Sequence, residues 1–374
     1  MFDDTGDLIV FLIVVGLRLI VPLFIPRFPL PAIIAALVID AVDQTVFQRW
    51  TTLDTGGPYQ SYDKALDVYY LTIAYLATMR NWDNLTAFEV SRFLFYYRLM
   101  GVFLYEFTHW RPILLIFPNT FEYFFIFYEA VRLRWNPKRM APKLVIAAAA
   151  AIWIFIKLPQ EYWIHVAQKD VTDTLRAHPT LIPVIAVALV ALLTAAWWVV
   201  TRKCPPAEWK PSISDPLLDH GGSSMTFNQT ELRLFAGRGF DRSLFEKVIL
   251  ISTISIIFGK MLPNTDVSGF QLAAGITVVI IGNMFVSSYF DRRDVTWNSV
   301  FREFGAMMTV NGVLAALFIL LEPGGSGSIG RGDLLFFLFL LTLIVLLYDA
   351  YRPMYRKRLE ESRLRVVDDE PLLA

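Results

Sequence analysis

The sequence predicts an all-α integral membrane protein, a polytopic bundle of about eleven transmembrane helices. Of its 374 residues, 55% are hydrophobic and only 18% are charged, and the mean hydropathy is +0.48. A soluble domain is about a quarter charged, so this balance argues against an ordinary cytosolic enzyme. Apolar stretches of about 20 residues recur along the chain, which is the length that crosses the hydrocarbon core of a bilayer.

Eleven stretches meet this length criterion. In chain order they cover residues 8–25, 30–47, 64–80, 87–108, 112–132, 144–165, 180–200, 247–263, 270–289, 304–321 and 333–350. The third is the weakest, because KALDVYYLTIAYLATMR is short and carries Asp67. If this stretch lay in the membrane interface, the count would be ten. The first stretch does not resemble a signal peptide, because the preceding MFDDTGD is acidic where a secretory signal is basic.

The distribution of Lys and Arg among the loops predicts the orientation, because cytoplasmic loops are enriched in both. Four connecting or terminal segments are basic: 132–143, 201–246, 290–303 and the tail that starts at 351. Eleven spans place all four on one side of the membrane, with the N-terminus outside and the C-terminus in the cytoplasm. Compact loops without targeting signals predict a multi-pass protein of a cell membrane, taken here as the bacterial inner membrane.

The chain divides into four parts by composition. Residues 1–200 form a seven-span bundle that carries charged residues, and residues 201–246 form a proline-rich cytoplasmic loop with one segment suited to an interfacial helix. Residues 247–350 form a four-span apolar bundle that packs against lipid, against the other spans or against a second copy. Residues 351–374 form a cytoplasmic tail that is basic and then acidic.

Charged residues inside the first seven spans are the main functional signal. A charge at the bilayer centre costs at least ~2.5–3.5 kcal/mol, so these side chains must pair with one another or line a hydrated cavity. The positions that we select as ion- or substrate-binding candidates are Arg18, Asp40, Asp43, Arg98, Glu106, Asn119, Glu122, Lys157 and Glu161. Buried ion pairs that only fix helix register are the structural alternative.

Hairpin geometry predicts which charges meet. Counting from the turn near Arg27 places Arg18 within ~4–5 Å of Asp40 along the helix axis, a distance that an arginine side chain covers. The same counting from the turn at 110–111 places Arg98 level with Glu122. We therefore expect an Arg18–Asp40 pair and an Arg98–Glu122 pair.

The sixth span contains a proline beside ionisable residues. Pro159 cannot donate an intrahelical hydrogen bond, so the helix should be distorted near Phe155. Lys157 and Glu161 flank the proline on one side of this helix. Broken helices with ionisable neighbours recur at ion and substrate sites, although plain structural kinks are commoner.

Several classes of site and partner are not predicted. The single cysteine, Cys204, excludes a multi-thiolate metal site, and we predict no metal. Equal numbers of basic and acidic residues, 34 each, point to no nucleic-acid partner. His109 and His165 could in principle ligate a haem iron, but the adjacent Trp110 and Trp163 favour an interfacial belt. We therefore predict no cofactor.

Two function classes remain, with a third as their alternative. A transporter or channel would move protons, cations or a small solute along the charged interior, and we favour it because the polar residues are spread over the depth of the bilayer. A membrane-embedded enzyme would act on a lipid or lipid-linked substrate from the outer leaflet, with carboxylates and His109 as acid–base groups. A structural or accessory subunit, either a homo-oligomer or bound to a membrane partner, needs neither chemistry.

Overall fold

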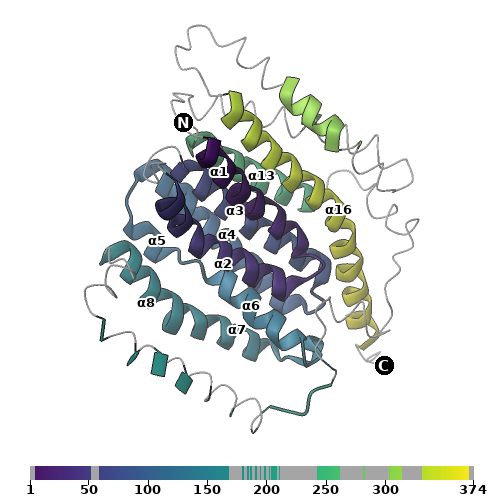
Figure 1. Cartoon of the computed structure of the whole chain (residues 1–374). Coiled ribbons are helices and arrows are strands. Elements are labelled where there is room, and N and C mark those ends of the chain that lie inside the picture. The colour runs from purple at the N-terminus through teal and green to yellow at the C-terminus, as the bar shows by residue number, and fades with distance from the viewer. Residues whose placement is uncertain are drawn as a thin grey trace.

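A computed structural model describes residues 5–51, 59–167, 242–261, 304–313 and 331–369, with short stretches or single positions between 179 and 210, at 281–282 and at 302. All regular secondary structure in this part of the chain is helical, as the sequence predicts. The helices lie side by side, with α7 and α8 along one edge and α16 along the opposite edge (Figure 1). Most of the predicted spans 180–200 and 270–289, the last part of 304–321 and most of the 201–246 loop fall outside the described residues.

The described helices begin and end within a few residues of the predicted spans, except at the C-terminal end of α16. They are α1 (Thr5–Ile20) with the 3-10 turn η1 (Val21–Phe24), α2 (Pro29–Trp50), α3 (Tyr59–Asn81), α4 (Leu85–Thr108), α5 (Pro112–Ile116), α6 (Thr120–Arg132), the turn η2 (Pro137–Arg139), α7 (Pro142–Ala151), η3 (Ile152–Lys157), α8 (Leu158–Glu161), η4 (Tyr162–Val166), α13 (Arg242–Met261) and α16 (Arg331–Asp369). Helices α2, α5 and α7 each have a proline in the first turn. Proline is favoured there because backbone N–H groups in the first turn have no intrahelical acceptor, so its missing N–H costs nothing.

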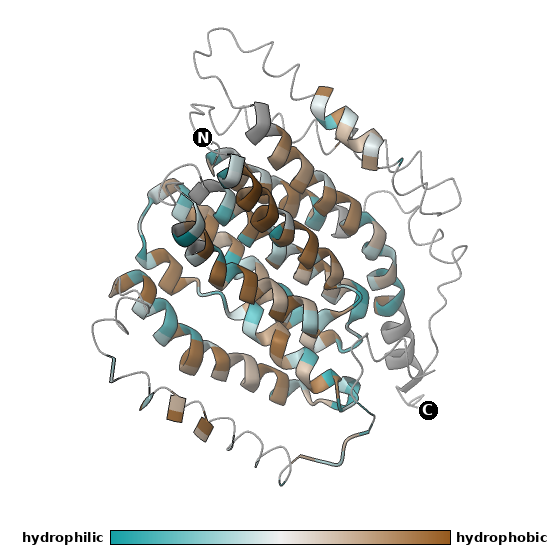
Figure 2. Cartoon of the chain, viewed as in Figure 1, coloured by the Kyte–Doolittle hydropathy of each residue, from teal (hydrophilic) through white to brown (hydrophobic). Residues whose placement is uncertain are grey.

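Three helical segments are long and apolar enough to cross a membrane. They cover Thr5–Phe24, Pro142–Val166 and Leu335–Leu359. Large apolar side chains on the first two point away from the protein, including Leu12 and Phe155, which are 59% and 77% exposed. Figure 2 shows α1 and α7 as predominantly hydrophobic. Because water would not favour such surfaces, they indicate a membrane protein.

Helix α3 lies at the centre of the bundle. It packs against α1, α2, α4, α6, α13 and α16, and its side chains from 65 to 79 are almost all buried. This position explains why the third predicted span is the least apolar: its neighbours are protein helices and not lipid. The surrounding core also includes α13 and α16, so residues from both ends of the chain share one apolar cluster.

The stretch 112–132 does not form the single unbroken helix that the sequence predicts. It breaks at 117–119, between α5 and α6. Pro118 lacks a backbone N–H, and Phe117 crosses α4 at Gly101, where a Cβ would lie only 2.3 Å from the Phe117 Cβ atom. A glycine on α4 therefore permits the close approach of the break.

The distortion predicted at Pro159 takes the form of two π-helical segments. Segment η3 precedes the short helix α8 and segment η4 follows it. The Leu158 N–H bonds to the Trp153 carbonyl, and the Ala167 N–H bonds to the Tyr162 carbonyl, each five residues back. Such π segments re-satisfy backbone groups that a proline leaves unpaired, and they frequently accompany functional residues.

At the other end of the chain, α16 is longer than the predicted span 333–350. It continues to Asp369 through Pro353, so much of the expected tail is helical.

Candidate functional site

One arginine binds four carboxylates inside the bundle. Arg18 Nη1 donates to Asp43 at 2.5 Å and to Asp63, and Nη2 donates to Asp67 at 2.6 Å and to Asp40. We call these five residues the Arg18 group. The predicted Arg18–Asp40 pair is confirmed, and the structure adds three further carboxylates to it.

The local sequence explains this convergence. Arg18 lies in the last turn of α1, and the short α1–α2 connection folds α2 back beside it. Asp40 and Asp43 are three residues apart on α2, and Asp63 and Asp67 are four residues apart on α3, so each pair shares one helix face. The two faces meet at the arginine.

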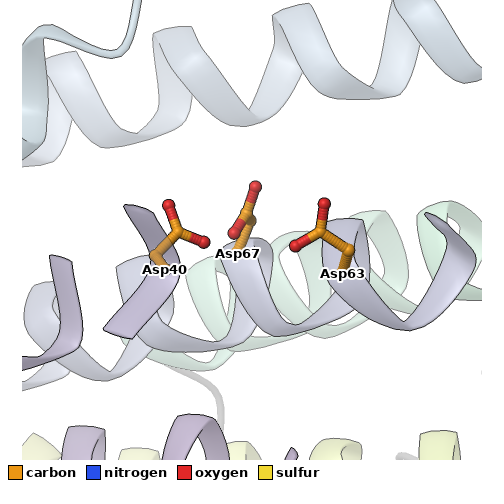
Figure 3. A group of neighbouring side chains, drawn as sticks. All are labelled: Asp40, Asp63 and Asp67. Carbon is orange, nitrogen blue, oxygen red and sulfur yellow. The ribbon is translucent and has the colours of Figure 1, made fainter. Parts of the chain in front are cut away.

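Some side chains of the Arg18 group are buried, and others are partly exposed. The side chains of Arg18 and Asp43 are only 3% and 1% exposed, whereas those of Asp40 and Asp67 are 34% and 45% exposed. Figure 3 shows the carboxylates of Asp40, Asp63 and Asp67 in a row, pointing to the same side. These three side chains are therefore partly accessible, at 34%, 20% and 45% exposure, whereas Arg18 and Asp43 beneath them are buried.

The same three carboxylates have the geometry of a cation site. One oxygen from each of Asp40, Asp63 and Asp67 lies within 4.8 Å of the other two. Carboxylate oxygens are the ligands that Mg²⁺ and Ca²⁺ prefer. Arg18 already donates to all three residues, so a metal ion would have to share them with the guanidinium.

A second polar group lies where α6 starts beside α8. Asn119 connects two carboxylates there: its Nδ2 donates to Glu122 at 2.6 Å, and its backbone N–H donates to Glu161 at 3.1 Å. Glu161 also accepts contacts from Lys157 Nζ at 3.7 Å and from His165 Nε2 at 2.9 Å. We call these five residues the Asn119 group.

Tyr70 links the two groups. It lies one helical turn after Asp67 on α3, and its hydroxyl donates to the Glu122 carboxylate. The neighbouring Tyr69 faces another way, and its hydroxyl donates to the backbone carbonyl of Leu19 at 3.1 Å. A single helix therefore carries polar contacts from the Arg18 group to the Asn119 group.

Two selected residues lie outside both groups. Arg98 donates to the Phe117 carbonyl at 3.1 Å, and within the described part of the chain it makes no ion pair with Glu122, so that predicted pairing is wrong. The α5–α6 break is the reason, because it presents a free carbonyl to the guanidinium. Glu106 instead accepts from Lys64 at 3.2 Å.

A further polar network occupies the opposite half of the bundle. Glu246 of α13 accepts from the hydroxyl groups of Tyr75 and Tyr96, the latter at 3.3 Å, and lies 3.7 Å from Arg92. Arg92 also pairs with Glu89 at 2.5 Å. We call this the Glu246 network.

Sequence reasoning missed several of these residues. Asp63 and Asp67 are spaced as a same-face pair, and that signal was available beside Asp40 and Asp43. Tyr70 and Glu246 offered no comparable signal. Glu246 lies 171 and 150 positions from its tyrosine partners, and only folding brings them together.

The two histidines considered for haem have other surroundings. His165 contacts Glu161, and His109 ends α4 in a left-handed conformation with φ of 51°, its ring edge-on to Tyr105. Among the described residues, no hydrogen bond or ring contact joins the two imidazoles.

Comparisons with known proteins give no match for this chain, whether with family models, curated proteins or solved structures. Its function is therefore argued from the geometry of the described residues.

Proposed function

We propose that this chain is a multi-span protein of a cell membrane that binds protons or cations in its charged interior and moves them, or a small solute, across the bilayer. The observation that carries the proposal is the Arg18 group. Four carboxylates surround one guanidinium. Even with Asp43 left out of the count, Asp40, Asp63 and Asp67 carry two more formal negative charges than Arg18 supplies.

Such an excess cannot persist in a membrane interior. Removing one ion from water costs several kcal/mol unless an opposite charge compensates it. The carboxylates of the group must therefore hold protons or cations, and interacting carboxyls share them as a unit. Because Asp40 and Asp67 are partly exposed, the bound species can exchange with water.

Polar contacts at both ends of α3 support movement across the membrane. The Arg18 group involves the first turns of α3, and the Glu246 network involves Tyr75 near its other end. Next to the Glu246 network, Phe95 stacks on Tyr75 at 4.5 Å and meets Phe121 edge-on. We infer that these rings close the interior in this conformation and must move during a transport cycle.

The eleven-span topology, with the N-terminus outside and the C-terminus in the cytoplasm, forms part of the proposal. Cys204 offers a direct test, because it is the only cysteine in the chain. A membrane-impermeant maleimide should label it in inside-out vesicles of the bacterial inner membrane and not in intact cells. Labelling confined to intact cells would reverse the orientation.

The transport proposal is tested in proteoliposomes that contain the purified full chain. Proton and Na⁺ or K⁺ fluxes are measured under an imposed gradient, with Asp67→Asn as the test variant and the exposed Glu208→Gln, outside all of these polar groups, as its control. We expect flux from the wild type and Glu208→Gln, and at least a tenfold loss for Asp67→Asn. Equal flux from both variants would overturn the assignment of the Arg18 group, and no wild-type flux under any gradient would count heavily against transport.

One observation favours an enzyme as the second candidate. Lys64–Glu106 joins the start of α3 to the end of α4, and Asn119–Glu161 joins the start of α6 to the end of α8, so many ionisable side chains gather at one end of the bundle. Three carboxylates there could hold Mg²⁺ against a phosphate of a lipid-linked substrate. Mg²⁺-dependent phosphate release from a polyprenyl diphosphate, lost in Asp67→Asn, would favour this candidate.

A further inference from the structure

A small cavity lies between α3, α4 and the α5–α6 break. Its walls include Val68 and Leu71 of α3, Leu99 and Val102 of α4, and the polar side chains of Arg98 and Asn119. Its volume is about 10 Å³, and a cavity of this size, measured for a water-sized sphere, has room for about one water molecule.

Two buried polar atoms of side chains that line this cavity have no hydrogen-bond partner among the described residues. They are Arg98 Nε, a donor, and Asn119 Oδ1, an acceptor. Other atoms of the same side chains are already bonded, since Arg98 Nη1 donates to the Phe117 carbonyl at 3.1 Å and Asn119 Nδ2 donates to Glu122 at 2.6 Å. Neither side chain can therefore turn away to find a partner without losing a bond that it now makes.

The orientation of the Asn119 amide is also fixed. If the amide were flipped, its oxygen would face the Glu122 carboxylate, acceptor against acceptor. The assignment with Nδ2 toward Glu122 and Oδ1 left over is therefore the favourable one.

We propose that one ordered water molecule occupies this cavity and bridges Arg98 Nε to Asn119 Oδ1. Water accepts a hydrogen bond from the guanidinium and donates one to the amide oxygen. A bare anion could serve only the first atom, and a metal ion only the second. Water satisfies both atoms in a volume of this size.

The bridge assigns a positioning role to Arg98. Asn119 holds Glu122 through its side chain and Glu161 through its backbone. A water bonded to Oδ1 fixes the remaining amide atom, so the guanidinium of Arg98 acts on both carboxylates through Asn119. The inference does not depend on transport, because a water site can be observed whether or not the protein moves ions.

The primary test is a structure of the full chain in lipid nanodiscs at a resolution that resolves ordered water. We expect a density peak at about 2.7–3.2 Å from both Arg98 Nε and Asn119 Oδ1. A dry cavity in a map that shows other buried waters would overturn the proposal. A direct contact between the two side chains, or an ion at the site, would overturn it as well.

A matched pair of valine variants gives a second test. Val68→Ile adds a methyl group at the cavity wall and should remove the peak, whereas Val345→Ile adds the same group to another buried part of the core and should leave it. In solution, the Arg98 Nε–H resonance, assigned by its loss in Arg98→Lys, should show magnetisation exchange with a long-lived water in the wild type and in Val345→Ile. An unchanged signal in Val68→Ile would contradict the assignment of the site.

Discussion

Replacement of Arg18 by methionine removes the one described cation of the Arg18 group and keeps an apolar stem of similar reach. Nη1 and Nη2 of Arg18 each donate to two carboxylates, and the side chain is 3% exposed. Removing one partner of a buried ion pair costs about 3–5 kcal/mol. We expect a loss near the lower end, about 3 kcal/mol, because the partly exposed carboxylates can take up protons or water.

The contribution of each carboxylate should follow its exposure. The side chain of Asp43 is 1% exposed and that of Asp67 is 45% exposed. Double-mutant cycles of Arg18→Met with Asp43→Asn should therefore give a coupling energy of about 2–3 kcal/mol, since little water screens this pair. The same cycle with Asp67→Asn should give about 0.5–1 kcal/mol, because water screens the charge.

The assay is reversible unfolding of the full chain in mixed micelles, followed by tryptophan fluorescence. Arg18→Lys serves as the conservative variant, because an ammonium keeps the charge but offers three donors on one nitrogen in place of a planar fork. It should recover part of the loss. A destabilisation below about 1 kcal/mol for Arg18→Met would refute the reasoning, and so would a coupling to Asp67 larger than that to Asp43.

Three further substitutions test the packing and the hydrogen bonds. Gly101→Ala places a Cβ 2.3 Å from a side-chain atom of the helix break and should cost about 1–3 kcal/mol by the same unfolding assay, whereas Gly16→Ala has open space and should be neutral or slightly stabilising. Tyr70→Phe, which removes a donor to a buried carboxylate, should cost about 1 kcal/mol more than Tyr69→Phe, which removes a donor to a backbone carbonyl; equal losses would contradict the link between the two polar groups. Arg358 donates to three carbonyls at the end of α3, so Arg358→Gln should speed amide exchange in the last turn of that helix, and unchanged exchange would show that this contact does not hold the helix end.

Much of the described fold follows from local sequence. Apolar length predicts the extents of α1, α2 and α4 to within a few residues. Simple hairpin geometry also predicts the Arg18–Asp40 pair, since both residues belong to one helical hairpin joined by a short turn. These are properties of a segment or of two adjacent segments.

Other features could not be read from the sequence because they depend on partners far along the chain. The break between α5 and α6 needs a glycine on α4 that lets Phe117 approach, and the break in turn directs Arg98 to a carbonyl in place of Glu122. The Glu246 contacts to Tyr75 and Tyr96 join residues more than a hundred positions apart. Counting along a single hairpin cannot find such pairs.

The helix with the weakest sequence signal for a membrane span makes polar contacts to three different groups in the interior, and both properties have one cause. A helix in contact with lipid must be apolar on its outer face, whereas a helix enclosed by other helices is free of that requirement. Helix α3 is enclosed, and so it can present Asp63 and Asp67 to Arg18, Tyr70 to Glu122 and Tyr75 to Glu246. In a polytopic sequence, a span of low hydropathy that carries carboxylates four residues apart is therefore the segment to place at the centre of the bundle, with its acidic face toward the other intramembrane charges.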